Sequence, residues 1–273
     1  MASRELGEIR DLACRVVSSF AQKRASRLWW REPVVASAPV DSRFLELRKM
    51  AAPDHILPWE LLSTARSVIV FFVPFARFLP VENRPGSLPS RSWGLAYVET
   101  NELISVLCQR IKGKLEARGQ RCETTPPTHN FDTASLKSRW SHKHIGFLCG
   151  LGKFGHNAQL ITPLGCAGRL GSLVTEADLG EGPLVGDGEA CLHRAGFKCL
   201  KCVKRCPVGA LTEDGLDRKA CWERLKFNIA SGGPLEGLPP TTHVCGKCVS
   251  VLPCSFHDPV ANSWAPKKPR ERA

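Results

Sequence analysis

The chain has 273 residues, 13 of them cysteines, and a formal net charge of +12 at pH 7. An odd cysteine count argues against a disulfide framework, and the sequence lacks both an apolar export segment at its start and an apolar run of the roughly 20 residues that cross a bilayer. We therefore expect a soluble, cytoplasmic, reduced protein without a membrane partner, in which clustered cysteines bind metal. The positive charge leaves three explanations open: an acidic electron donor, nucleic acid, or compensation of anionic metal clusters.

Hydrophobic periodicity predicts two long helices, over residues 5–24 and 100–118, the second closed by Gly119. Residues 67–73 and 171–175 are short apolar runs that predict strands, and the first is apolar on both faces, as in a buried central strand. Helices that alternate with buried strands indicate an α/β domain through about residue 180.

The composition changes along a glycine-rich acidic stretch, residues 181–189, which is the best candidate for a domain boundary. The cysteine-rich part beyond it has few apolar runs, so we expect bound metal to supply much of its stability. Three parts follow from this division. We expect an α/β cofactor or substrate domain over 1–183, a small ferredoxin-like domain with two [4Fe–4S] clusters over 184–262, and a basic disordered tail over 263–273.

The cysteine array centres on Cys199-Leu-Lys-Cys202-Val-Lys-Arg-Cys206-Pro207, which keeps the C-x2-C-x3-C-P part of a bacterial ferredoxin motif. Cys191 replaces the cysteine that the motif places three residues before Cys199, and four more cysteines bring the total to eight. Two [4Fe–4S] clusters require eight thiolate ligands, and in ferredoxins the cysteine before the proline binds the neighbouring cluster. We therefore assign one cluster to Cys191, Cys199, Cys202 and Cys254, and the other to Cys206, Cys221, Cys245 and Cys248.

Two zinc sites would also use eight cysteines, because C-x2-C pairs are typical of zinc ribbons. The C-x3-C-P spacing, followed by Val208-Gly-Ala-Leu, favours clusters over zinc. The other five cysteines have no partner spacing. Of these, Cys14 and Cys108 are interpreted as buried apolar residues on helices, and a reactive role stays open for Cys149 and Cys166.

A glycine motif, Gly150-Leu-Gly152-Lys-Phe-Gly155, matches the dinucleotide-binding pattern G-x-G-x-x-G. That pattern must open a helix whose N-terminus holds the pyrophosphate, and here a proline at 163 leaves room for only one or two turns. We therefore interpret the motif as a loop close to a flat ligand, or as a simple turn.

With these motifs in view, the chain resembles the epoxyqueuosine reductase-like proteins with two [4Fe–4S] clusters, as a short relative without the helical-repeat region of the tRNA-modifying members. The resemblance covers most of the length. It is carried by the cysteine array and by the segments Thr128-His-Asn-Phe-Asp132, Trp140-Ser-His-Lys-His144, Cys149-Gly-Leu-Gly152, Gly155-His156-Asn157 and Gly165-Cys-Ala-Gly-Arg-Leu-Gly-Ser-Leu-Val-Thr175.

The resemblance implies a nitroreductase-like, corrinoid-binding α/β domain, in which two clusters pass electrons to a cobalamin-type cofactor. It also makes Asp132 the nearest counterpart of a proposed proton donor, with a turn or cap as the alternative role. His142 and His144 would face the same way on a strand and are candidates for cofactor contact or proton transfer, with a structural role as the alternative. Contacts to a corrinoid or a substrate are further expected from Gly150, Gly152, Asn157 and Arg169.

The leading expectation is a corrinoid-dependent reductase that resembles epoxyqueuosine reductase. It would receive electrons from a reduced ferredoxin- or flavodoxin-type donor, with tRNA as a candidate partner. Two alternatives stay open: a dicluster protein that only delivers electrons to a partner enzyme, and an iron–sulfur protein that binds nucleic acid. The large first domain favours the reductase, because a pure electron carrier needs no such domain.

Overall fold

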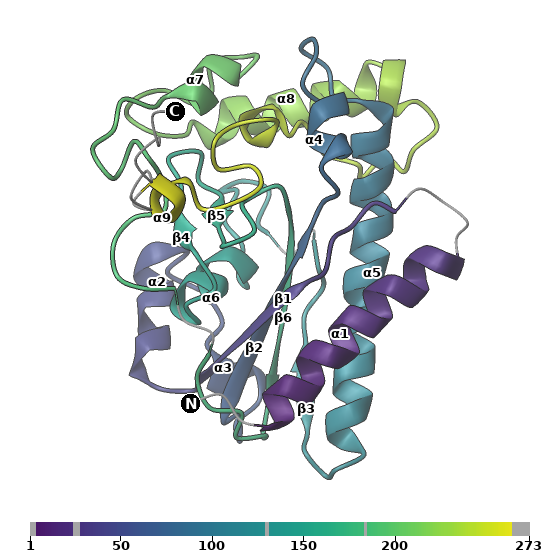
Figure 1. Ribbon diagram of the computed structural model, residues 1–273, viewed down its shortest axis with the longest axis vertical. Coiled ribbons are helices and arrows are strands. Elements are labelled where there is room, and N and C mark those ends of the chain that lie inside the picture. Colours follow the sequence, from purple (N-terminus) through teal and green to yellow (C-terminus); the bar gives the residue numbers. More distant parts are fainter. Residues whose placement is uncertain (1–3, 24–27, 129–130, 183–184, 264–273) are drawn as a thin grey trace, which may run out of the picture.

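A four-stranded antiparallel sheet forms the centre of the fold in the computed structural model, which describes residues 4–23, 28–128, 131–182 and 185–263 (Figure 1). The strand order is β1-β2-β6-β3, with β1 at Val34–Pro39, β2 at Ser67–Pro74, β3 at Cys122–Thr124 and β6 at Gly168–Thr175. Both predicted strands are therefore present. Their antiparallel pairing differs from the parallel arrangement that an apolar strand such as β2 most often indicates.

Every residue of β2 is buried, because helices cover both faces of the sheet. Alternate side chains of this strand enter two separate hydrophobic cores, Ile69, Phe71 and Val73 on one face and Val68, Val70 and Phe72 on the other. The apolar run that predicted a central strand is thus explained by helices packed above and below it.

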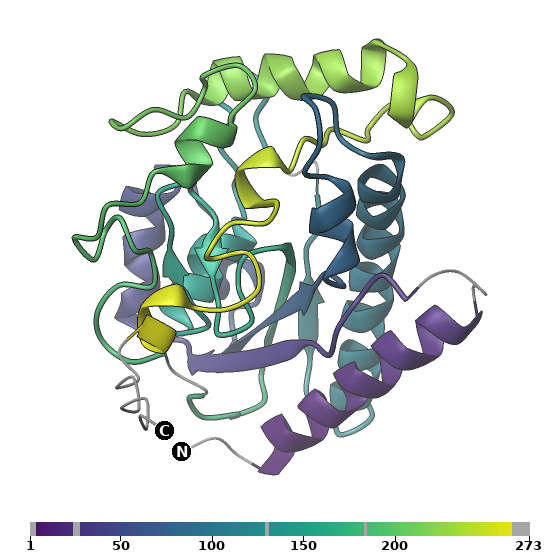
Figure 2. The ribbon, with the colours of Figure 1, turned by 45° about the horizontal axis from the view of Figure 1, so that its top comes forward.

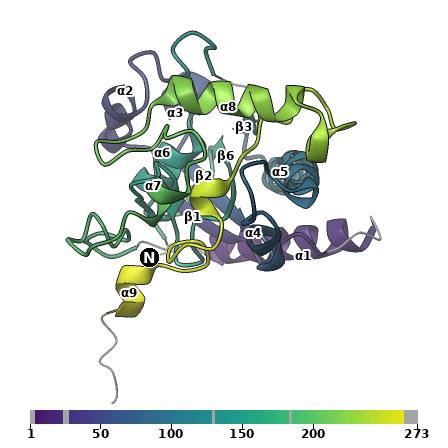
Figure 3. The same cartoon turned by 90° about the horizontal axis from the view of Figure 1, so that it is seen from above.

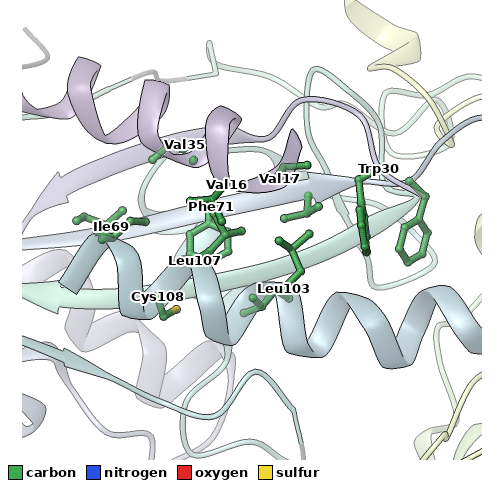
Figure 4. Close-up of a cluster of buried hydrophobic side chains, with 14 of the residues drawn as sticks. Val16, Val17, Trp30, Val35, Ile69, Phe71, Leu103, Leu107 and Cys108 are labelled. Carbon is green, nitrogen blue, oxygen red and sulfur yellow. The ribbon is translucent and has the colours of Figure 1, made fainter. Parts of the chain in front are cut away.

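The first core lies between the sheet and two long helices, α1 at Arg4–Lys23 and α5 at Arg91–Glu116 (Figure 4). Both helices were predicted, but α5 begins nine residues before the predicted start at 100. Its N-terminus is set by Ser90, whose hydroxyl accepts a hydrogen bond from the Trp93 amide at 3.2 Å. Gly119 follows the helix with φ +75°, the left-handed conformation expected of a glycine that ends a helix.

The second core lies on the opposite face, under short elements: η1 (Ser42–Leu45), α2 (Glu46–Met50), α3 (Pro58–Leu61) and α6 (His142–Leu148). The helical α6 removes the shared face that a strand would have given His142 and His144. On a helix, residues two apart point in different directions, so these two histidines do not share a face. Trp140 is buried in this core, and its indole donates to Ser172 Oγ at 3.0 Å.

The glycine motif leads into a hairpin of β4 (Lys153–Phe154) and β5 (Leu160–Ile161), so no dinucleotide-binding helix follows it. A Cβ built on Gly152 would lie 2.4 Å from the Ile161 carbonyl oxygen. The space beside this glycine is therefore filled by the protein's own backbone. On that side of Gly152 there is no room for a ligand.

The cysteine-rich part covers one end of the sheet with α7 (Lys201–Arg205), α8 (Arg218–Ala230), η2 (Gly233–Leu235), η3 (Lys247–Val249) and α9 (Pro259–Ser263). Viewed from above, α8 crosses this end of the molecule, with α5 on one side and α2 on the other (Figure 3). The last segment then turns back beside the loop before β6 (Figure 2), where the amides of Cys166 and Ala167 donate to the carbonyls of Cys254 and Ser255 at 2.9 and 3.1 Å.

This part of the chain shares the first core instead of having a separate one. Leu235, Val244 and Val249 belong to the same buried cluster as α1 and α5, and a Cβ on Gly94 of α5 would lie 2.5 Å from Leu235 Cδ2. The expected boundary at residues 183 and 184, and the tail beyond residue 263, lie outside the described residues. One further short helix, α4, spans Phe78–Glu82. Within the described ranges, no helix is both long enough and apolar enough to cross a membrane.

Candidate functional site

The eight cysteines of the array line two cavities, four in each. The smaller cavity is lined by Cys191, Cys199, Cys202 and Cys254, which we call the first cysteine set. A cavity of about 270 Å³, here called the inner cavity, is lined by Cys206, Cys221, Cys245 and Cys248, the second cysteine set. These are the two groupings expected from the ferredoxin spacing. Within the described ranges, no three or more His, Cys, Asp or Glu side chains converge closely enough to hold a single metal ion.

Local backbone geometry directs the cysteines of the central motif to different cavities. Cys202 lies within α7, whereas Cys206 caps the helix with an extended backbone, φ −69° and ψ 116°, and Pro207 follows it. Because the chain changes direction at Cys206, its thiol lies at the inner cavity, away from that of Cys202. The structure thus brings Cys206 together with the later cysteines and leaves Cys202 with Cys191.

Cys245 and Cys248 are positioned by a tight turn at Gly246, which has φ +70° and ψ 4°. This left-handed conformation is unfavourable for residues with a Cβ, and a Cβ here would also lie 2.3 Å from the Trp93 ring. The Trp93 side chain of α5 therefore fills the space that a larger residue would need. Asn83 Nδ2 fixes the turn further by donating to the Cys245 carbonyl at 2.9 Å.

Burial raises the pKa of the Cys202 and Cys221 thiols to about 11, and it raises the pKa of Cys248 further. Neighbouring cysteines of the same set add to the effect, because several thiolates close together repel one another. Without metal these thiols are protonated near neutral pH. A bound metal centre would displace the protons and supply the positive charge that several adjacent thiolates require.

Asn157 and Cys166 lie between the two cysteine sets. Asn157 is 3% exposed and lines both cavities, and its Nδ2 donates to the Cys248 carbonyl at 2.9 Å. Cys166 lines the inner cavity, and its Sγ lies 3.8 Å from Sγ of Cys254 in the first set. The two residues therefore form the partition between the cavities. Cys149, the other cysteine for which a reactive role stayed open, is buried in the second core, where burial raises its thiol pKa.

A larger cavity of about 390 Å³, the outer cavity, adjoins the inner one. The two share Tyr97, Arg169, Leu216, Cys221, Leu225 and His243 in their linings. Aromatic rings form part of its wall, with Trp222 edge-on to Phe131 at 5.3 Å between centroids and 4.5 Å from the His243 ring. A ligand in this cavity would therefore lie directly beside Cys221 of the second cysteine set.

Two of the predicted site residues beyond the cysteines line these cavities in addition to Asn157. Arg169 projects from β6 into both, with its guanidinium stacked 4.3 Å from the centroid of the Tyr97 ring. His144 lines the outer cavity and exchanges a 2.7 Å hydrogen bond with Ser141 Oγ. Burial, with the charge of Lys143 next to it, lowers the pKa of His144 to about 3, so this ring is neutral.

His142 has a structural place, between Ser172 Oγ at 2.7 Å and the Pro126 carbonyl at 3.3 Å. Burial lowers its pKa to about 4, and it lines neither the inner nor the outer cavity. These hydrogen bonds favour a structural role for His142 over the expected contact with a cofactor. Gly150 likewise lines neither cavity, and its carbonyl accepts from the Val185 amide at 2.8 Å.

Asp132 is not among the lining residues of either cavity, although its neighbour Phe131 lines the outer one. Its side chain is exposed and accepts from the Ser135 amide at 2.6 Å, and this hydrogen bond holds the carboxyl pKa below its usual value. A carboxylate that is stabilised in its charged form is a poor proton donor, so the turn role replaces the expected acid role. The neighbouring residues 129 and 130 of the Thr128 motif lie outside the described residues.

Sequence reasoning missed several residues of the outer cavity: Tyr97, Lys143, Arg218, Trp222 and His243. They come from α5, α6, α8 and the turn before η3, and no spacing in the sequence links them. One signal was available, because Tyr97 is the only tyrosine in the chain. Lys143 lies between the two candidate histidines in the sequence.

Comparison with known proteins identifies the fold. No protein-family model matches the chain, and no curated protein matches it. An epoxyqueuosine reductase solved with an epoxyqueuosine-modified tRNA-Tyr stem loop superposes with a TM-score of 0.53 at 16% identity, covering 90% of this chain and 66% of that one. The Bacillus subtilis epoxyqueuosine reductase gives 0.51 at 17% identity, with the same coverage of both chains.

A catabolic reductive dehalogenase in complex with 3-bromo-4-hydroxybenzoic acid gives a TM-score of 0.57 at 14% identity, covering 84% of this chain and 30% of that one. The chain thus spans just under two thirds of the two epoxyqueuosine reductases and less than a third of the dehalogenase. The resemblance seen in the motifs is confirmed for the fold: this chain is a mixed α/β protein with an antiparallel sheet, folded like epoxyqueuosine reductase.

Proposed function

We propose that the chain is an iron–sulfur reductase in which the first cysteine set holds one [4Fe–4S] cluster and the second set holds another. The observation that carries this proposal is the shared wall between the cavities, since Cys221 of the second set also lines the outer cavity. Electrons from the second cluster would need to cross only this wall to reach a ligand. The mixed α/β fold shared with epoxyqueuosine reductase and a reductive dehalogenase supports a reductase-like function.

The donor chemistry of both sets fits a cluster, because each cavity offers the four thiols of its set and no competing carboxylate among its described lining residues, with Cys166 as a fifth thiol at the inner cavity. Asn157 would hold the two clusters at a fixed separation, since it is hydrogen-bonded to the Cys248 carbonyl and lines the cavity of the first set. Cys166, beside Cys254, would place one additional thiol at the first cluster without being required as a ligand.

The cavities also fit a corrinoid, whose edge carries carboxamide groups that accept hydrogen bonds. Arg169 Nε and Arg224 Nε are buried at the inner cavity without a hydrogen-bond partner among the described residues, so the wall offers unused donors. We propose Asn157 at the inner cavity and His144 at the outer one as contacts to this group. A bound corrinoid would supply the reduced cobalt centre that drives reductive chemistry. Leu216 and Leu225, which line both cavities, would exclude water from it.

The electron donor is proposed to be an acidic ferredoxin- or flavodoxin-type protein that docks beside the first cysteine set. A surface hollow of about 560 Å³ adjoins Cys199 and is lined by Lys198, Lys204 and the exposed ring of Phe197. Lys201, on the adjoining turn of α7, is exposed as well. A basic rim around an exposed aromatic ring is suited to a negatively charged partner that binds briefly. The first cluster would then be the entry point for electrons.

Cobalamin titration of the anaerobically purified protein tests this function. We expect a brown protein with broad visible absorbance, saturable cobalamin binding, and reduction of the bound cobalamin by electrons supplied to the clusters. Intact clusters without cobalamin binding would leave only a dicluster electron carrier, and a colourless protein with bound zinc would refute both. One structural neighbour was solved with a tRNA stem loop, so we propose tRNA as a partner to test by gel shift at moderate salt.

A further inference from the structure

The outer cavity gathers positive charge without a carboxylate. Its described lining residues include Lys137, Lys143, Arg169 and Arg218, and neither Asp nor Glu is among them. The four residues come from three separate parts of the chain: the turn before α6 and α6 itself, β6, and the first turn of α8. Their convergence is a property of the folded protein and leaves no pattern in the sequence.

The hydrogen bonds of these cations leave most of their charge uncompensated. Lys143 Nζ donates to the Ala158 carbonyl at 3.0 Å, and Arg169 stacks on Tyr97 while its Nε has no hydrogen-bond partner. No ion pair involves any of the four within the described part of the chain. Placing several cations in a partly dry cavity is costly unless a negative charge joins them.

Lys143 is held in the cavity at a cost to its charged form. Burial, together with the charge of Arg218, lowers its pKa to about 8, whereas Cys221 and Cys248 act in the opposite direction. Part of the charge of Lys143 would therefore be offset by an anionic second cluster. Burial also lowers the pKa of Arg169, and Tyr97 acts in the opposite direction.

We propose that the outer cavity binds a small organic anion, a carboxylate or phosphate monoester carried on an apolar or aromatic body, as the substrate of the proposed reductase. The role of the anion as a substrate rests on the proposed function, whereas its binding to the cavity does not require turnover. The guanidinium of Arg169 and the ammonium of Lys143 would bind the anionic group. The rings of Phe131 and Trp222 would contact the body of the ligand beside Cys221.

Binding of benzoate, phenyl phosphate and neutral benzamide to the cluster-loaded, cobalamin-free protein tests the site, with saturation-transfer NMR as the readout. We expect at least one anion to bind about tenfold or more tightly than benzamide, because the neutral analogue leaves the cations unpaired. Arg169→Gln and Lys143→Gln should each weaken that binding about tenfold. Lys153→Gln, which removes the same charge from β4 outside the cavity, should leave the binding unchanged.

Equal binding of benzamide and the anions, or anion binding that survives both cavity variants, would overturn the proposal. So would binding of an RNA stem loop that Lys143→Gln abolishes while the small anions do not bind, since the cations would then serve a nucleic-acid backbone. Competition by cobalamin but not by cobinamide, which lacks the nucleotide phosphate, would assign the cations to the corrinoid and also overturn it. Anion binding in a protein that does not bind cobalamin would refute only the corrinoid part of the proposed function.

Discussion

Replacing Gly246 by alanine tests how the protein holds the second cysteine set. The substitution has two costs: a left-handed backbone at φ +70°, and a Cβ placed 2.3 Å from the Trp93 ring. The backbone cost is about 1–2 kcal/mol, and forcing an atom into a packed region costs about 1–3 kcal/mol more. The free energy of unfolding should therefore fall by about 2–5 kcal/mol.

Two other glycines separate these costs. Gly119 has φ +75° with no atom within 4 Å of the position that a Cβ would take, so Gly119→Ala should show the backbone cost alone. Gly186 has neither a positive φ nor a close neighbour, so Gly186→Ala should be nearly neutral. The three variants share one chemical change and differ only in conformation and space.

Thermal unfolding of the anaerobic, cluster-loaded variants provides the measurement, read as an apparent Tm under matched conditions. We expect Gly246→Ala to lower the Tm by on the order of 10 °C and Gly119→Ala by a few degrees. Iron content should also fall in Gly246→Ala alone, because its turn carries Cys245 and Cys248. A Gly246→Ala protein with the Tm and iron content of Gly119→Ala would refute the packing of this turn against Trp93.

Three further outcomes are expected. Asp132→Asn should leave reductase activity unchanged in steady-state assays, because the carboxylate caps a turn outside the cavities; a strong loss of kcat would restore its role as an acid. The affinity for benzoate should fall as the pH rises through about 8, where Lys143 loses its proton, and calorimetry from pH 6 to 10 would show this. The bound anion raises that pKa, so the midpoint in the complex should be higher, and a flat profile would exclude Lys143 as a contact. Lys201→Glu with Lys204→Glu should slow electron transfer from an acidic ferredoxin at low salt and leave dithionite reduction unchanged; equal rates from the ferredoxin would refute the docking surface.

The fold was partly predictable from the sequence, because local patterns specified its main elements. Helical periodicity predicted α1 and most of α5, and the apolar run of β2 predicted a strand buried on both faces. The first turns of α5 were missed because prolines precede them and because the capping role of Ser90 is seen only with the Trp93 amide in place. Antiparallel pairing could not be predicted, since it depends on the order in which distant strands meet.

The candidate site divides in the same way. The spacing around Cys199, Cys202 and Cys206 predicted two groups of four cysteines, and the same groups line the two cavities. Cluster binding by these groups stays a prediction. The cationic outer cavity did not, because Lys143 and Arg169 come from a helix and a strand that meet only in the folded protein. The helix that begins at His142 was not predicted, because a seven-residue helix is too short to show clear periodicity.

Iron and acid-labile sulfide analysis, combined with EPR of the dithionite-reduced protein, tests the central claim most directly. Two [4Fe–4S] clusters predict about eight iron and eight sulfide per chain, and two magnetically interacting signals. Replacing Cys221 by alanine should remove about half of the iron and leave a single signal without interaction. Full iron content in that variant, or a wild-type protein that contains zinc and no sulfide, would contradict the assignment of two clusters to the two cysteine sets.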